Sequence, residues 1–373
     1  MLHAMKRIIF YLLVSSSMVS CKQIQQATDV ITQPTPREVY ARDFDKEDIA
    51  YQRWLNAYEI AQKDSLQAPL PFSLSGQLQT PNYRAFSYEV PIKQGERLYA
   101  TVASEPDSLQ FFLEAFQKNT NDPVARSEEN GTILTYLAER TDTLQIVVQP
   151  ELYANGNFQL QLYTQPSYAF PVSGAGNKNV QSFWGAARDG GRRSHQGIDI
   201  FAARGTPVVA AIEGRVSSTG ERGLGGKQVW LRDGLFGASL YYAHLDSIAV
   251  RTGTRVKVGD TLGFVGNTGN ARTTAPHLHF GIYQGYSGAV DPYPFVAQQE
   301  IPQGTIIEVP STALIRRNNA ELRTGPSTKF TQIAGVQQKD TVAVYGQAGN
   351  WYHIQLQDSL KGFMHRSLLE LLP

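Results

Sequence analysis

Residues 276–280 of the chain read Pro-His-Leu-His-Phe. Side chains two residues apart in a β-strand point to the same face, so His277 and His279 share one face, while Leu278 and Phe280 share the other. Two imidazoles are costly to bury together unless they form hydrogen bonds or bind a metal ion. The stretch therefore predicts a strand with one face in a hydrophobic core and one face that carries chemistry.

Two earlier segments supply further side chains of the same chemical kind. Residues 194–200 read Ser-His-Gln-Gly-Ile-Asp-Ile, which places Asp199 four residues after His195. Gly197 lies between them and is expected to let the backbone turn, so that both side chains can reach one ion. His244 lies in a second stretch, Tyr-Tyr-Ala-His-Leu. The three segments together offer an imidazole-rich set with one carboxylate.

Zinc is the metal ion that best suits this set of side chains. Histidine is a favoured zinc ligand, a carboxylate often completes the set, and a catalytic zinc keeps one position open for water beside three protein ligands. Four imidazoles and one carboxylate exceed that need by two. The surplus imidazoles can serve as a general base or stabilise a transition state. Spacing alone does not say which three side chains bind the ion.

In this order, the three segments resemble the lysostaphin/LytM-type zinc endopeptidases, and the resemblance covers roughly residues 170–297. It implies an antiparallel β domain that hydrolyses peptide bonds in bacterial peptidoglycan. The resemblance also implies the roles of the site residues, with His195, Asp199 and His279 as zinc ligands and His244 and His277 as catalytic residues.

The resemblance leaves alternatives open. A catalytically silent relative could bind the wall and activate another cell-wall hydrolase, but such relatives usually lack some metal or catalytic residues, and this sequence has all five. A wall-binding adaptor without zinc is a third hypothesis. Arg188, Arg192 and Arg193 could contact substrate carboxylates, although we expect them to form a solvated face.

We expect a mainly β, multidomain protein. Residues 47–65 carry apolar side chains at helical spacing, and short alternating stretches separated by turn residues follow over residues 69–164. This pattern predicts a helix packed on a β-sandwich over residues 47–168, and its layout resembles the jelly-roll domains that accompany secreted bacterial peptidases. The peptidase domain is expected to span residues 169–300.

Residues 305–373 return to short strands. A Leu-Arg-Thr-Gly-Pro stretch, the pair Trp351 and Tyr352, and a later Gly-Phe-Met-His stretch resemble bacterial SH3-like domains. The resemblance implies a small β-barrel that binds wall peptides. The alternative is a docked structural domain in which the two aromatic residues belong to the core.

The first residues have the pattern of a targeting signal. A basic start, a short apolar run and small residues make residues 1–20 similar to a lipoprotein signal peptide. Cys21, the only cysteine, is then the expected lipidation site, and residues 21–46 are a polar tether. This predicts an exported protein of the cell envelope, held on a membrane by a lipid anchor and facing the periplasm.

Composition excludes other classes of protein. The chain has 373 residues, with 34 Lys and Arg against 33 Asp and Glu, a net charge of +1. We therefore expect no nucleic-acid partner, which would need a clustered basic surface. Only the first segment is apolar enough to approach a membrane, so the chain is not a multi-pass membrane protein.

Overall fold

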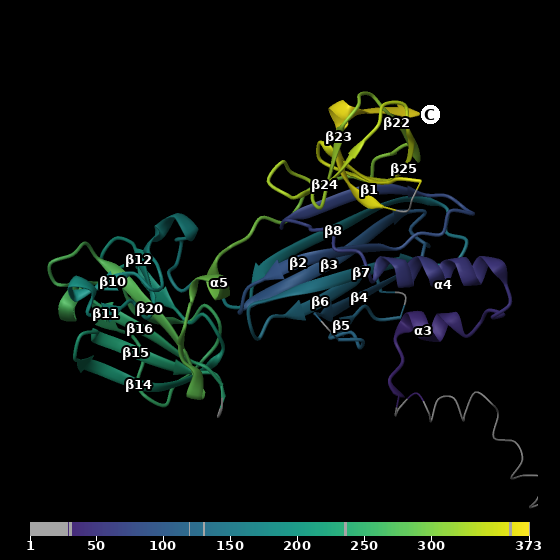
Figure 1. The fold of residues 1–373 in the computed structure, drawn as a ribbon. Helices are drawn as coiled ribbons and strands as arrows, with labels where there is room; N and C mark the ends of the chain where they lie inside the picture. Colours follow the sequence, from purple (N-terminus) through teal and green to yellow (C-terminus); the bar gives the residue numbers. More distant parts are fainter. Residues whose placement is uncertain are drawn as a thin grey trace, which may run out of the picture.

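The computed structural model describes residue 29 and residues 32–118, 120–129, 131–234, 237–357 and 360–372. The predicted signal peptide and Cys21 lie outside the described residues. None of the helices in the described part is long and apolar enough to cross a bilayer. The fold is mainly β, as predicted, and Figure 1 shows one β domain beside a larger body that contains the amino-terminal and carboxy-terminal strands.

The amino-terminal domain is a sandwich of eight antiparallel strands. They are β1 (Phe72–Leu78), β2 (Phe86–Ile92), β3 (Glu96–Glu105), β4 (Phe111–Gln117), β5 (Ala125–Arg126), β6 (Ile133–Leu137), β7 (Asp142–Pro150) and β8 (Gly156–Pro166). One sheet has the order β1-β8-β3-β6 and the other has the order β2-β7-β4-β5. This is the strand order of a jelly roll, which confirms the fold expected for this region.

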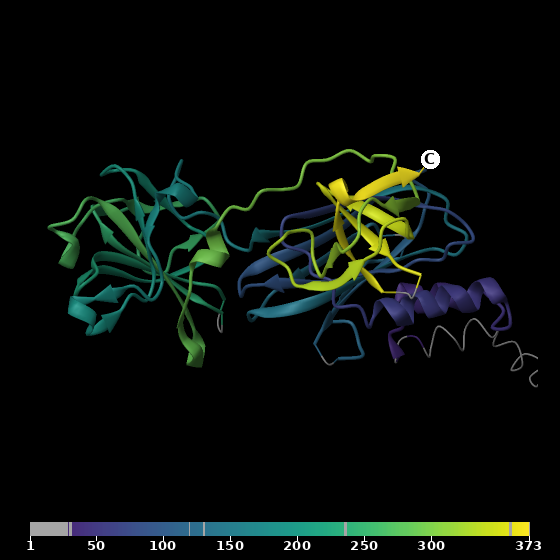
Figure 2. The ribbon, with the colours of Figure 1, turned by 45° about the horizontal axis from the view of Figure 1, so that its top comes forward.

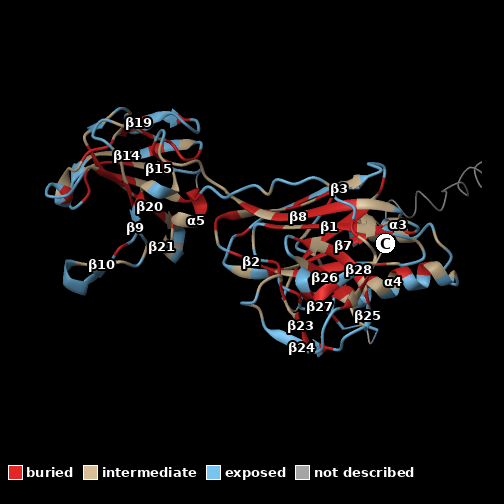
Figure 3. Ribbon diagram, turned by 90° about the horizontal axis from the view of Figure 1, so that it is seen from above, coloured by how far each residue is buried: buried red, intermediate tan, exposed pale blue. Residues whose placement is uncertain are grey.

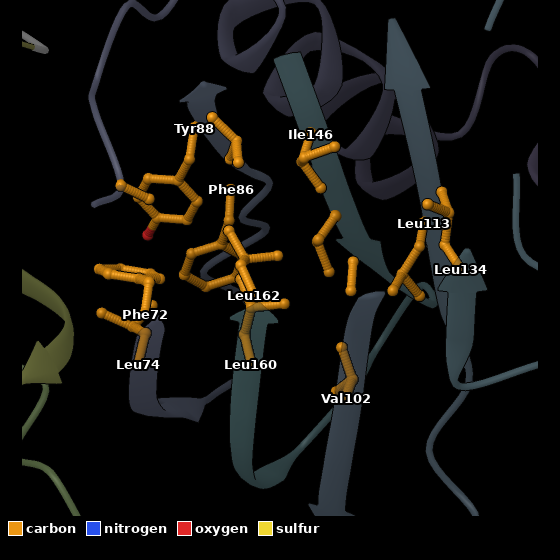
Figure 4. Close-up of a cluster of buried hydrophobic side chains, with 14 of the residues drawn as sticks. Phe72, Leu74, Phe86, Tyr88, Val102, Leu113, Leu134, Ile146, Leu160 and Leu162 are labelled. Carbon is orange, nitrogen blue, oxygen red and sulfur yellow. The ribbon is translucent and has the colours of Figure 1, made fainter. Parts of the chain in front are cut away.

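Alternating side chains build the sandwich core. Along β3, Leu98, Ala100 and Val102 are buried, while the residues between them are half-buried. Figure 4 shows that large apolar side chains from both sheets meet between them, including Phe86 of β2 and Leu160 of β8. In Figure 3 the strands of the sandwich are accordingly coloured as buried over much of their length.

The predicted helix is present as α4 (Ile49–Ala61). Asp48 is its N-cap and accepts a hydrogen bond from the Ala50 backbone N–H at 2.7 Å. Trp54 is buried against Phe112 of the sandwich, and its indole N–H donates to the Pro150 carbonyl at 2.8 Å. The apolar face of the helix therefore packs on the sandwich, as predicted. A short helix precedes it, α3 (Pro36–Ala41), inside the segment expected to be a tether.

The carboxy-terminal strands form a small barrel. They are β22 (Thr312–Ile315), β23 (Ala320–Arg323), β24 (Gln332–Val336), β25 (Thr341–Ala348), β26 (Trp351–Gln355), β27 (Lys361–His365) and β28 (Leu369–Leu372). The barrel has its own core, which includes Tyr352, but β25 also pairs with β1, so that one sheet of eleven strands runs from the barrel into the sandwich. Tyr345 and Phe363 of the barrel are buried in the sandwich cluster.

The middle domain carries the three histidine motifs. Its strands are β9 (Val180–Ser182), β10 (Ala187–Arg188), β11 (Arg193–Ser194), β12 (Ile198–Phe201), β13 (Pro207–Val209), β14 (Gly214–Arg222), β15 (Gly226–Arg232), β16 (Ser239–Leu245), β17 (Ser247–Ile248), β18 (Arg255–Val256), β19 (Thr261–Phe264), β20 (His277–Gln284) and β21 (Gly288–Val290). The main sheet has the order β18-β14-β15-β16-β20-β12-β9, with β21 paired to β20. Because β20 lies between β16 and β12, residues of both strands come close to His277 and His279 on β20.

The middle domain joins the larger body through two segments of chain. The Tyr168 backbone N–H donates to the carbonyl of Phe295, in the short helix α5 (Tyr293–Val296), at 2.8 Å. Residues 298–310, which contain no helix or strand, then lead to the barrel, as Figure 2 shows. The Gln94 amide of the sandwich also donates to Gln284 Oε1 at the end of β20, at 2.8 Å.

Candidate metal centre and active site

Strand pairing brings three of the predicted residues together. Asp199 of β12 lies directly opposite His279 of β20, and His195 lies just before β12. Asp199 Oδ1 is 3.0 Å from His279 Nδ1 and 3.1 Å from His195 Nε2. The two imidazole nitrogens are 3.0 Å apart. Three ligand atoms therefore face one point from two adjacent strands.

The spacing of these atoms suits a tetrahedral ion. Zinc bonds nitrogen at about 2.0–2.1 Å, so two ligands of a tetrahedral site are separated by about 3.3 Å. The separations of 3.0–3.1 Å lie close to that value. No other described side chains form a comparable group of His, Cys, Asp or Glu. Two imidazoles and one carboxylate are a donor set that fits zinc, and they form a grouping able to hold a metal ion.

A backbone carbonyl sets the tautomer of His195. Its Nδ1 lies 3.0 Å from the Phe183 carbonyl oxygen, which can only accept a hydrogen bond. Nδ1 therefore carries the hydrogen, and Nε2 presents a lone pair to the other two ligand atoms. Ser182 Oγ lies 3.4 Å from the same Nδ1. The carbonyl thus orients the ring for metal binding.

Gly197 has a different role from the one expected. It is absent from the residues with positive φ, so the turn does not need a glycine for its backbone angles. A Cβ at this position would instead lie 2.6 Å from Cε1 of His279 and 2.6 Å from the Phe280 carbonyl oxygen. The glycine leaves the space that the ring of His279 occupies. The expectation that the backbone needs a glycine to turn here was wrong, because packing, and not backbone freedom, selects the residue.

Asp199 is held as a carboxylate. Burial by itself would raise its pKa, but its contacts with the imidazoles of His195 and His279 outweigh burial and hold the pKa well below its usual range. The second oxygen, Oδ2, accepts a hydrogen bond from Arg188 Nη2 at 2.7 Å. Arg188 was expected on a solvated face. Its side chain instead turns toward the site, where Nη2 also donates to Ser182 Oγ at the end of β9.

His244 and His277 complete a cluster of four imidazoles. The ring of His244 lies 5.1 Å from that of His277 and 5.8 Å from that of His279, between ring centres. His244 has a φ of 63°, a left-handed conformation that is rare outside glycine. This conformation interrupts the alternation of β16 after Ala243 and lets His244 line the same groove as His279. Strained backbone of this kind is often found at functional sites.

Both of these imidazoles present Nε2 without a hydrogen. His244 Nδ1 lies 2.9 Å from the Thr268 carbonyl oxygen, and His277 Nδ1 lies 2.9 Å from that of Ala275. A carbonyl oxygen only accepts, so in both rings Nδ1 carries the hydrogen when the ring is neutral. Burial, and then the neighbouring His277, lowers the pKa of His244 to about 4. His244 is therefore neutral near pH 7 and can take up a proton at Nε2.

The five residues line one groove with a volume of about 520 Å³. Its walls include residues that the sequence did not single out, among them Ser182, Tyr241 and Tyr283. The ring of Tyr241 meets that of His279 edge to face, with 5.8 Å between centres. Tyr241 comes directly before the Tyr-Ala-His-Leu motif. The alternation of side chains along a strand could not by itself show that Tyr241 faces the groove. Asn270 also lines the groove.

Residues 193–292 match the family model described as "Peptidase family M23", and residues 318–370 match that of "Bacterial SH3 domain". The chain contains an M23 peptidase domain. The expected resemblance to lysostaphin and LytM-type endopeptidases is thereby confirmed, as is the SH3-like domain. The matched segment contains all five residues of the site. The flanking strand β9 lies outside it.

Several relatives resemble the M23 region. The L-Ala--D-Glu endopeptidase of Bacillus subtilis (strain 168) is 37% identical over 144 residues, which are 36% of this chain and 44% of the relative. Lysostaphin of Staphylococcus simulans is 34% identical over 145 residues, 37% of this chain and 29% of the relative. The chain thus spans less than half of the length of these relatives. The solved catalytic domain of that lysostaphin shares 35% identity over 32% of this chain and 92% of its own, with a TM-score of 0.29.

Proposed function

We propose that the chain is a zinc-dependent endopeptidase that hydrolyses peptide bonds in the stem or crosslink peptides of bacterial peptidoglycan. The observation that carries the proposal is the convergence of His195, Asp199 and His279 on one point, inside a groove that two further imidazoles line. Relatives of the M23 region that are named as endopeptidases support the reaction class. An open groove suits an extended peptide, which is the form of the proposed substrate.

The three ligands have defined roles in this proposal. His195 and Asp199 are buried, and His279 is half-buried at the groove, so the ligand atoms are largely shielded while the groove gives access to them. A zinc ion held there would act as a Lewis acid that polarises a carbonyl group and lowers the pKa of a water molecule to about 7. Asp199 is held as a carboxylate, and burial lowers the pKa of His279, so both effects favour the protonation states that metal binding needs.

His244 and His277 would act in general acid–base catalysis. Each presents a bare Nε2 to the groove because a backbone carbonyl accepts the hydrogen on its Nδ1. Such a nitrogen can accept a proton from the attacking water as a general base. Once protonated, the same nitrogen becomes a donor that can stabilise the oxyanion of the tetrahedral intermediate or return the proton to the leaving amine.

The location of the enzyme in the envelope is also part of the proposal. The lipoprotein-like signal at residues 1–20 and the position of Cys21 support export and lipid anchoring on a membrane, which would place enzyme and substrate in one compartment. Fatty-acid labelling of the wild-type protein and of a Cys21→Ser variant tests this point. Labelled wild-type and unlabelled variant protein are expected, and an unlabelled wild-type protein would refute the anchor.

Digestion of defined peptidoglycan fragments tests the activity. Purified protein is incubated with zinc, with a chelator, and with a chelator followed by added zinc, and mass spectrometry identifies the products. We expect cleavage of a peptide bond that the chelator abolishes and zinc restores. Zinc binding without any cleavage would favour a silent activator of another hydrolase, and absence of zinc binding would favour a wall-binding adaptor.

A further inference from the structure

We infer that Arg188 is a positioning residue for the metal site: its guanidinium holds Asp199 so that this carboxylate offers only one oxygen to the ion. Arg188 Nη2 lies 2.7 Å from Asp199 Oδ2 and 2.6 Å from Ser182 Oγ. The other carboxylate oxygen, Oδ1, faces His195 and His279. The two oxygens of Asp199 are thus assigned to different partners.

The surroundings of Arg188 make this contact more than a surface ion pair. The side chain of Asp199 is only 11% exposed, whereas that of Arg188 is 32% exposed. Ser182 lies opposite Asp199 in the pairing of β9 with β12, so the guanidinium bridges two residues that are already neighbours in the sheet. A hydrogen bond between two ionised groups is stronger than a neutral one, and its geometry is more strictly defined.

The chain path couples Arg188 to a second ligand. Arg188 of β10 pairs with Arg193 of β11, and His195 directly follows β11. The His195 backbone N–H donates to the Ala186 carbonyl at 2.9 Å, which continues this hairpin up to the ligand. One arm of the hairpin therefore carries the guanidinium and the other leads to His195. Figure 3 shows β10 at the exposed edge of the domain.

The consequence concerns coordination number. A carboxylate free to turn can bind an ion through both oxygens, which would occupy the position that a catalytic zinc keeps open for water. With Oδ2 bound to Arg188, only Oδ1 is available. Partners of this kind, one shell away from the ion, typically contribute 10–100-fold to metal affinity. This role of Arg188 rests on the proposed metal site, to which Arg188 is added as a residue outside the ligand set.

An Arg188→Met variant tests the inference without relying on activity. Met keeps an unbranched apolar stem and removes the charge and the donors. Zinc affinity is measured by competition with a chromophoric chelator, and the coordination of Co²⁺ substituted for zinc is followed by visible absorption, which is intense for four-coordinate and weak for six-coordinate Co²⁺. We expect zinc binding about tenfold weaker or more, with a weaker Co²⁺ spectrum.

Arg192→Met is the matched control. It lies in the same hairpin, and its Nε donates to the Asp189 carbonyl oxygen at 3.1 Å, not to Asp199. We expect unchanged zinc affinity and an unchanged Co²⁺ spectrum for this control, and partial recovery of both properties in Arg188→Lys. Circular dichroism of the metal-free variants verifies that they are folded.

The outcomes separate this inference from the proposed function. Wild-type protein that binds no zinc refutes the proposed metal site. Wild-type protein that binds zinc, together with an Arg188→Met variant of equal or tighter affinity and the same Co²⁺ spectrum, refutes only the positioning role of Arg188.

Discussion

The Tyr88 hydroxyl of the sandwich lies 2.9 Å from Nδ1 of His353 in the SH3 domain, although 265 positions separate the two residues in the chain. His353 is fully buried, and its ring stacks on that of Phe363. Nearby, Lys361 of the barrel pairs with Asp64 at 2.7 Å, and Arg84 donates to the Val344 carbonyl at 2.6 Å. The SH3 domain is therefore docked on the sandwich through buried polar contacts as well as through a shared sheet.

The burial of His353 predicts that stability depends on pH. Burial, and then the charges of Lys361 and Arg84, lower the pKa of His353 well below its usual value of 6.5. Below about pH 6.5 the unfolded chain binds a proton that the folded chain does not, so the free energy of unfolding falls as the pH falls. We expect a loss of about 1.4 kcal/mol from this residue between pH 7.5 and pH 5.5.

Denaturant unfolding at the two pH values measures this effect. A His353→Phe variant keeps an aromatic ring without a titratable group, and its loss of stability between pH 7.5 and pH 5.5 is expected to be smaller than that of the wild type by the same amount. An identical pH dependence in the two proteins would show that His353 is not the group that titrates.

The metal site predicts a difference between two histidine substitutions. His279→Ala removes a ligand and is expected to abolish both zinc retention and hydrolysis. His244→Ala leaves the three ligands in place and is expected to retain zinc but lose hydrolysis by about 100-fold or more, the usual contribution of a general acid–base residue. Metal analysis and digestion of cell-wall sacculi provide the two measurements. Normal digestion by the His244 variant would show that the assigned role is wrong.

Gly197 predicts a third effect. Its Cβ would lie 2.6 Å from the ring of His279, so Gly197→Ala is expected to displace a ligand and weaken zinc binding about tenfold or more. Gly335→Ala is a suitable control, because a Cβ there would meet no atom closer than 3.7 Å, far from the metal site on β24. Chelator competition compares the two. Wild-type affinity in Gly197→Ala would mean that the His279 ring moves aside without cost.

The shared core predicts that two domains lose stability together. Phe363 is fully buried, belongs to the barrel and packs in the sandwich cluster, so Phe363→Ala is expected to cost about 3–5 kcal/mol. Hydrogen exchange should show lower protection in β1 and β8 as well as in the barrel. Met364→Ala, which opens the barrel's own core, should lower protection mainly in the barrel. Equal patterns in the two variants would contradict the shared core.

Local sequence determined much of the fold because side-chain period is a local property. Alternation over residues 69–164 predicts short strands, and helical spacing around Trp54 predicts a helix, and both are present. The jelly-roll strand order agrees with the expected layout. The peptidase segment was assigned on its motifs, which hold a fixed order along the chain. The domain boundaries and the roles of the site residues remain predictions.

The sequence by itself determined which side chains the site could use: period two puts His277 and His279 on one face, and only a few residue types bind zinc. Tertiary structure decided the rest. The left-handed backbone at His244, the space that Gly197 leaves, the contact of Arg188 with Asp199 and the docking of the SH3 domain all depend on atoms far apart in the chain. The reason is physical: a local pattern sets the direction of a side chain along its own strand, but its partner is chosen only when strands pair and pack.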